Sequence, residues 1–183
     1  MATRNSTCAQ VAKLVRAVFK ESFPNIACDV HAYTYPFGAW VLIAWNDGPT
    51  ERQVEPIAAA FTGLRRDADG NLHRCADVTF DGVPMKCRLD RVIKHRGYSQ
   101  PFVERALVAV YAKHLQAFHL HQIAAPTYAQ YEAGQLWQHK FASESEHRFV
   151  SVHELVNAEL DGQSGIEPQN SPTLARIGCT DAI

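Results

Sequence analysis

The sequence predicts an α+β domain in which an antiparallel sheet of about four strands carries helices on one side. Segments with helical and strand periodicity follow one another in the order helix, strand, strand, helix, strand, strand, helix, and then shorter helices. A hydrophobic content of 46% is enough for a core in 183 residues. No repeat of 20 to 50 residues is present, which argues against a repeat array.

The first expected helix begins after Thr7 and ends before Pro24. Residues 26–35 then alternate between apolar and polar side chains, as in a strand with one solvated face. Residues 39–45 are apolar on both faces, as expected of a strand inside a sheet. The first helix is predicted from apolar side chains that recur every three or four residues, at Val11, Leu14, Val15, Val18 and Phe19.

A loop after the second strand is expected to start the next helix. Thr50 and Gln53 have the spacing of a capping box, in which each side chain bonds the backbone amide of the other residue. Val54, Ile57 and Phe61 follow as its buried face. We therefore assign a structural role to the residues of this loop: Trp45, Asp47, Gly48, Pro49, Thr50 and Gln53.

The second half of the chain is expected to begin with a hairpin over residues 75–96 that turns at residues 81–84. A long helix over 100–118 follows, and then short helices over 128–136 and 152–160. These elements predict three parts. They are an α+β domain over residues 1–100, a helical extension packed on it over 101–162, and a flexible tail over 163–183.

Composition argues against several classes of protein. The formal net charge of −1 is not that of a basic nucleic-acid binder. Five scattered cysteines without a Cys-x-x-Cys pair indicate reduced thiols rather than a disulfide framework. The polar N-terminus and the lack of about 18 consecutive apolar residues predict a cytoplasmic protein without a membrane partner.

Motifs of catalysis and cofactor binding are incomplete. His153 and Glu154 lack the second histidine of a zinc protease, because Asn157 stands in its place. His114 and His121 would lie about 10 Å apart along one helix, which is too far to share a zinc ion. We therefore expect no cofactor, no metal and no catalytic residues, while an enzyme that uses histidine or cysteine remains an alternative.

Two groups of exposed side chains are candidate contacts for a partner. The second arm of the expected hairpin places alternate basic residues on one face, where they could follow a phosphate backbone while exposed aromatic rings stack on bases. The alternative is a solvated sheet face whose charges prevent edge pairing. The candidates are Tyr33, Tyr35, Arg65, Arg66, Lys86, Arg88, Lys94 and Arg96.

The run "FPNIACDVHAYTYPFGAWVLIAWNDGPTERQVEPIAAAF", together with "HRGYS", resembles a large polyvalent protein associated domain. The resemblance covers roughly residues 10–100. It rests on the order of helix, strand, strand and helix around a Trp-x-Asp-Gly-Pro-Thr motif. Its residues here are Phe23, Pro24, Trp45, Asp47, Gly48, Pro49, Thr50 and Val54.

The resemblance implies a setting in phages and conjugative plasmids and carries over no catalytic residues. We expect a non-catalytic accessory protein that binds a host protein or ribonucleoprotein complex in the bacterial cytoplasm. A CRISPR surveillance complex is the specific candidate, with the chain acting as an anti-CRISPR inhibitor. The alternative is a nucleic-acid binder that uses the basic hairpin.

Overall fold

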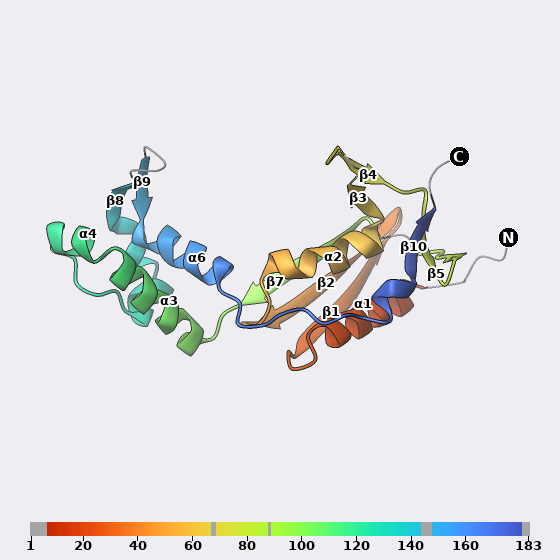
Figure 1. Cartoon of the computed structure of the whole chain (residues 1–183), viewed down its shortest axis with the longest axis horizontal. Coiled ribbons are helices and arrows are strands. Elements are labelled where there is room, and N and C mark those ends of the chain that lie inside the picture. Colours follow the sequence, from red (N-terminus) through yellow and green to blue (C-terminus); the bar gives the residue numbers. More distant parts are fainter. Residues whose placement is uncertain (1–6, 67–68, 88, 144–147, 181–183) are drawn as a thin grey trace. The chain divides into compact units, whose positions relative to one another are not determined.

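The structure, a computed structural model, describes residues 7–66, 69–87, 89–143 and 148–180. The chain forms two compact units, which are residues 1–97 with 164–183, and residues 98–163. The first unit is therefore discontinuous in sequence, and the second unit is inserted into it. Figure 1 colours both units along the chain.

The main sheet of the first unit has three strands, β1 (Cys28–Tyr35), β2 (Gly38–Asn46) and β7 (Arg91–Gly97), in the order β1-β2-β7. The α+β class is confirmed, but the sheet is mixed. β1 pairs with β2 antiparallel, whereas β2 pairs with β7 in parallel. A helical crossover lies between β2 and β7, and such a connection is what allows neighbouring strands to run in the same direction.

Helices α1 (Cys8–Ser22) and α2 (Glu51–Thr62) lie on one side of this sheet (Figure 1). Both begin with complete capping boxes, Thr7 with Gln10 and Thr50 with Gln53, so the predicted box at Thr50 is confirmed. Their apolar faces meet alternate residues of β2. The fully buried side chains at this junction include Val11, Val15, Phe19, Val41, Ile43 and Val54.

The expected hairpin over residues 75–96 is only partly formed. β5 (Asp77–Phe80) pairs with β6 (Val83–Pro84) around the predicted turn, but β7 leaves this hairpin and joins the main sheet. The polar connection before it contains a small hairpin of β3 (Leu64–Arg66) and β4 (Leu72–Arg74). The second arm is therefore divided between β6 and β7 instead of forming one strand.

Residues 164–180 do not form the expected flexible tail. Gln169 donates its amide to the carbonyl oxygen of Ser22 at 2.9 Å, and a short helix η2 (Leu174–Arg176) follows. Strand β10 (Ile177–Thr180) then pairs with β5 antiparallel. The segment is ordered by these tertiary contacts, so its weak internal periodicity gave no indication of its structure. The rest of the expected tail, residues 181–183, lies outside the described residues.

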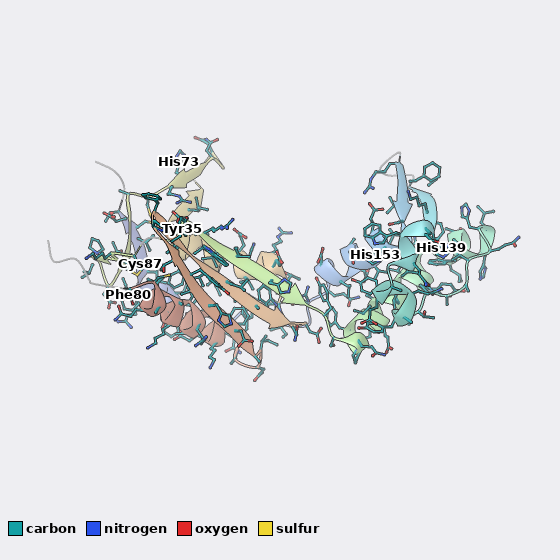
Figure 2. All side chains as sticks on the ribbon, turned by 180° about the vertical axis from the view of Figure 1, so that it is seen from behind. Tyr35, His73, Phe80, Cys87, His139 and His153 are labelled. Carbon is teal, nitrogen blue, oxygen red and sulfur yellow. A yellow bond between two sulfur atoms is a disulfide. The ribbon has the colours of Figure 1, made fainter. Side chains whose placement is uncertain are left out.

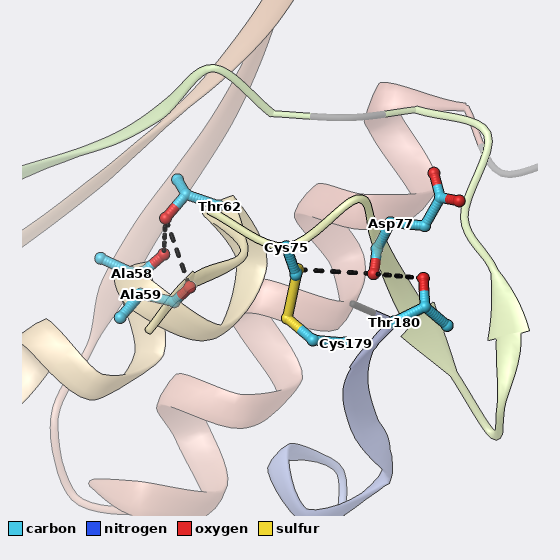
Figure 3. The surroundings of a disulfide bond; sticks show 7 residues. All are labelled: Ala58, Ala59, Thr62, Cys75, Asp77, Cys179 and Thr180. Carbon is cyan, nitrogen blue, oxygen red and sulfur yellow. Dashed lines mark hydrogen bonds between the residues drawn. A yellow bond between two sulfur atoms is a disulfide. The ribbon is translucent and has the colours of Figure 1, made fainter. Parts of the chain in front are cut away.

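A disulfide fixes this C-terminal segment to the first unit. Cys75 and Cys179 are bonded with their Cα atoms 5.8 Å apart (Figure 3). The prediction that all five cysteines are reduced thiols is therefore wrong for this pair. Pairing of β10 with β5 brings the two residues together across 104 positions of sequence.

The second unit is mainly helical, with its own core. The expected helix over 100–118 is interrupted at His114, which separates α3 (Gln100–Lys113) from α4 (Leu115–Leu120). Then follow α5 (Tyr128–Glu132), the 3₁₀ helix η1 (Gln135–Gln138), an unpredicted hairpin of β8 (Lys140–Ser143) and β9 (Arg148–Ser151), and α6 (Val152–Gly162). Ser151 and Glu154 form a capping box at the start of α6. Buried in the core are Phe102, Val103, Ala106, Leu107, Val110, Phe118, Leu136, Phe141, Val152, Val156 and Leu160.

Candidate functional site

The Trp-Asn-Asp-Gly-Pro-Thr loop is held by backbone and side-chain hydrogen bonds. The indole Nε1 of Trp45 donates to the carbonyl oxygen of Pro49 at 2.9 Å. The guanidinium of Arg96 donates to the carbonyl oxygens of Asp47 and Gly48, at 2.9 and 3.0 Å. Asp47 and Gly48 both have positive φ, 53° and 57°. These contacts hold the loop against the end of β7.

The same loop and the helix it starts bond the two segments of the first unit that flank the insertion. The amide of Asp47 donates to the carbonyl oxygen of Gly97, the last residue before the insertion, at 2.8 Å. The side-chain Nε2 of Gln53 donates to the carbonyl oxygen of Ile166, just after the insertion, at 2.7 Å. The motif loop and α2 therefore bind both segments of the first unit that adjoin the inserted second unit.

The basic residues predicted to form one stripe are separated from one another. Arg96 is 6% exposed and donates to the motif loop, while Lys94 forms an ion pair with Glu55 of α2. Lys86 is exposed between β6 and β7. Arg65 and Arg66 lie in β3, with side chains outside the described part of the structure, and Arg88 lies outside the described residues entirely. Lys94 and Arg96 face the helices and the motif loop, so a continuous basic stripe through them is not formed.

The face of the main sheet opposite α1 and α2 is a different candidate surface. Strand register places its side chains in three rows that each cross β1, β2 and β7. We call this surface the open face. Its rows are Tyr33, Trp40 and Arg91, then His31, Leu42 and Ile93, and then Asp29, Ala44 and His95.

The first row is a stacked assembly. The rings of Tyr33 and Trp40 are 4.0 Å apart and inclined by only 14°. The guanidinium of Arg91 lies 5.6 Å from the centre of the Trp40 ring, within the range of a cation–π contact. Tyr33 is 42% exposed, so this predicted contact residue does lie at the surface.

Tyr35 extends the open face towards the β1–β2 turn, where Phe37 is 96% exposed. Its hydroxyl donates to Oδ2 of Asp90 at 2.5 Å, and that hydrogen bond raises the pKa of Tyr35. Asp90 Oδ2 also accepts from the amide of Ala39 at 3.0 Å. Gly38 is needed here, because a Cβ atom at this position would lie 2.0 Å from Asp90 Oδ2. Figure 2 shows Tyr35 on this side of the molecule.

A cleft of about 470 Å³ lies at the other end of the open face. Asp29, Ala44 and His95 form part of its wall and belong to the third row, while Asp47 and Gly48 of the motif loop complete it. Cys28 also lines the cleft, and burial raises the pKa of its thiol. The open face is therefore stacked and aromatic at one end and polar at the other.

The second unit contains another aromatic group. The imidazole of His153 lies between the rings of Tyr131 and Trp137, with ring centres 4.6 and 4.3 Å away. Its Nδ1 is buried without a hydrogen-bond partner, and desolvation lowers the pKa of His153. Within the described residues, no three His, Cys, Asp or Glu side chains form a group that could hold a metal ion. None of the helices in the described ranges is long and apolar enough to span a membrane.

Sequence reasoning missed Trp40, Leu42, Arg91 and Ile93 as surface residues. The composition of residues 39–45 predicts burial on both faces, but only the alternate positions Ala39, Val41, Ile43 and Trp45 are buried. A signal was present, because the short turn at residues 36–37 places Trp40 opposite Tyr33. The place of Arg91 could not be found this way, since it depends on the long crossover to β7.

Comparison with known protein families finds a match in the N-terminal part of the chain. The profile of large polyvalent protein associated domain 29 matches residues 6–99, which include α1, the main sheet, α2 and the motif loop. No curated protein and no solved structure matches the chain. The match ends two residues into the second unit, so residues 100–163 lie outside it. The chain belongs to the large polyvalent protein associated domain 29 family, whose domains are associated with polyvalent proteins of phages and plasmids.

Proposed function

We propose that this chain is a non-catalytic accessory protein that binds a host macromolecular complex through the open face of its first unit. The observation that carries the proposal is the composition of that face. Tyr, Trp and Arg dominate the energetic centres of protein interfaces, and Tyr33, Trp40 and Arg91 form the first row. Leu42 and Ile93 add apolar area beside them.

The charges of the open face indicate the chemistry of its partner. Arg91 is the cation of the three rows and Asp29 is their carboxylate, while the imidazoles of His31 and His95 offer ring N–H donors at the row ends. A protein surface with an apolar centre and acidic groups at its rim would complement this arrangement. In its specific form, the proposal identifies the partner as a CRISPR surveillance complex in the host cytoplasm and the effect as inhibition of host defence. The mobile-element setting of the family supports this form.

A nucleic-acid partner is less well supported, because it relied on a continuous basic stripe. Arg96 is buried and Lys94 is paired with Glu55, so the stripe lacks two of its four members. Charge reversal at Arg96 would disturb the motif loop and could not report on nucleic-acid binding alone. The open face offers only one arginine over its three rows, which is too little to follow a phosphate backbone.

The test is binding by the full chain and by two matched variants. Trp40→Ser combined with Arg91→Glu removes the stacked row, while Arg52→Glu reverses an exposed charge on α2 of the same unit. Capture from a host lysate after nuclease treatment identifies candidate complexes, and each is then purified and titrated with the three proteins. We expect the open-face variant to lose at least tenfold in affinity and Arg52→Glu to bind as the parent does.

Inhibition is tested separately, in host cells that carry an active CRISPR system against a phage. We expect expression of the parent chain to restore plaque formation and the open-face variant to fail. Equal binding by the open-face variant and the parent would contradict the assigned surface. Recovery of nucleic acid alone, lost after nuclease treatment, would overturn the protein-binding proposal.

A further inference from the structure

The second unit contains a pocket of about 350 Å³ that the proposed function does not use. It opens between the end of α4, the connection to α5, the residue before β8 and the start of α6. Its size lies within the range of small-molecule sites, about 300–1,000 Å³. All of its lining residues belong to the inserted unit and lie outside the family match, so a role for this pocket is independent of the open face.

The floor of the pocket is apolar. Phe118, Leu136 and Val152 line it, and none of them is more than 1% exposed. They come from α4, η1 and the first position of α6, which are elements of one core. The amide of Val152 donates to the carbonyl oxygen of His139 at 2.8 Å, which fixes the floor to the rim. A ligand that binds here would therefore bury apolar surface away from water, which favours binding.

The rim of the pocket is rich in hydrogen-bond donors. Gln130 uses its Oε1 to accept from the amide and the hydroxyl of Thr127, at 3.0 and 3.1 Å, so its NH₂ group is the end available to a ligand. The imidazoles of His121 and His139 add ring N–H groups. Figure 2 labels His139. Among the described residues that line the pocket, none carries a carboxylate.

These two features together select a class of ligand. Donors without an opposing carboxylate favour an anion over a cation. Two imidazoles and an amide, without arginine or lysine, suit a carboxylate better than a phosphate. The apolar floor requires a hydrophobic body beside the charged group. We propose that this pocket binds a small carboxylate with an apolar body, the carboxylate lying at the rim by His121, His139 and Gln130.

The test uses the full chain and three probes of nearly equal shape: phenylacetate, its neutral amide phenylacetamide, and the cation phenethylamine. Indole-3-acetate serves as a larger second carboxylate. Ligand-observed NMR titration up to about 10 mM detects binding with Kd values near 1 mM. We expect saturable binding of at least one carboxylate, and at least tenfold weaker binding of the amide and the amine.

Variants then locate the site. His139→Ala and His121→Ala are expected to weaken carboxylate binding at least fivefold. His119→Ala is the matched control, because His119 is exposed in α4, two residues before His121, and does not line the pocket. Amide hydrogen exchange of Val152 checks that each variant retains its fold.

Three results would overturn the proposal. The first is no saturable binding of either carboxylate. The second is equal binding of phenylacetamide, which would remove the role of the anion. The third is an equal loss in His119→Ala, which would place the binding elsewhere. Each of these results is independent of whether the open face binds a host complex.

Discussion

The carboxylate of Glu21, at the end of α1, accepts two hydrogen bonds from Thr173, from its amide at 2.9 Å and from its hydroxyl at 2.7 Å. A third bond comes from the hydroxyl of Ser171 at 2.5 Å, and these bonds lower the pKa of Glu21. The side chain of Glu21, near the N-terminus, thus binds a segment that lies 150 residues further along the chain. The first unit is therefore completed by chain that follows the inserted unit.

We expect Glu21→Ala to destabilise the first unit by about 1–3 kcal/mol, because three donors lose a charged acceptor. Hydrogen exchange at the amide of Thr173 should accelerate together with that of β10. Glu167→Ala, an exposed acidic residue in the same segment, is the control for loss of charge. If the amide of Thr173 exchanged as slowly in Glu21→Ala as in the parent, that result would contradict this role of the carboxylate.

Cys179→Ser should lower the free energy of unfolding of the first unit by about 2–5 kcal/mol, because the crosslink closes a long loop. Urea unfolding with and without reductant measures the effect. Reductant should destabilise the parent and leave Cys179→Ser unchanged. Cys28→Ser, a free cysteine of the same unit, should keep the sensitivity to reductant. A reductant effect that persists in Cys179→Ser would rule out this crosslink.

Gly48→Ala should destabilise the motif loop in two ways. A side chain at φ 57° is strained, and the new Cβ would lie 3.0 Å from Cδ1 of Ile26. Gly82→Ala separates these effects, because Gly82 has φ 73° but nothing within 4 Å of a new Cβ. We expect a cost of about 1–2 kcal/mol at Gly82 and a larger one at Gly48, measured by thermal unfolding. Equal costs would mean that Ile26 moves aside freely.

Glu154→Gln should reduce the acid sensitivity of the second unit. The backbone hydrogen bond from Ser151, with bonds from Arg148 and the Ser151 hydroxyl, lowers the pKa of Glu154 to about 2. Stability from this carboxylate is therefore present above the ordinary pKa of 4.5 and is lost as pH falls towards about 2. Glutamine keeps an acceptor for the cap, as Gln53 does in α2, but cannot titrate.

Hydrogen exchange in α6 at pH 7, 4 and 2 tests this prediction. The variant should exchange faster than the parent at pH 7, and the difference should vanish at pH 2. Glu132→Gln removes one charge from the same unit outside the cap and is the control. A difference that stays constant from pH 7 to pH 2 would contradict a titrating cap.

Short-range rules explain the features that could be predicted from the sequence. The capping boxes at Thr50 and Ser151, the helical stripe from Val11 to Phe19 and the alternation of β1 each depend on residues within a few positions. The α+β class and the structural role of the motif loop followed from these patterns. The exposure of Tyr33 and Tyr35 could also be inferred from alternation along a single strand.

The pairing of distant segments depends instead on the tertiary structure. Parallel pairing of β2 with β7 brings Arg91 beside Trp40 and divides the expected basic stripe, burying Arg96 against the motif loop. Pairing of β10 with β5 joins Cys179 to Cys75 and orders a segment without periodicity of its own. Such contacts depend on which surfaces remain to be buried once the local elements have formed. That choice is a property of the whole packed core, and no short window of sequence contains it.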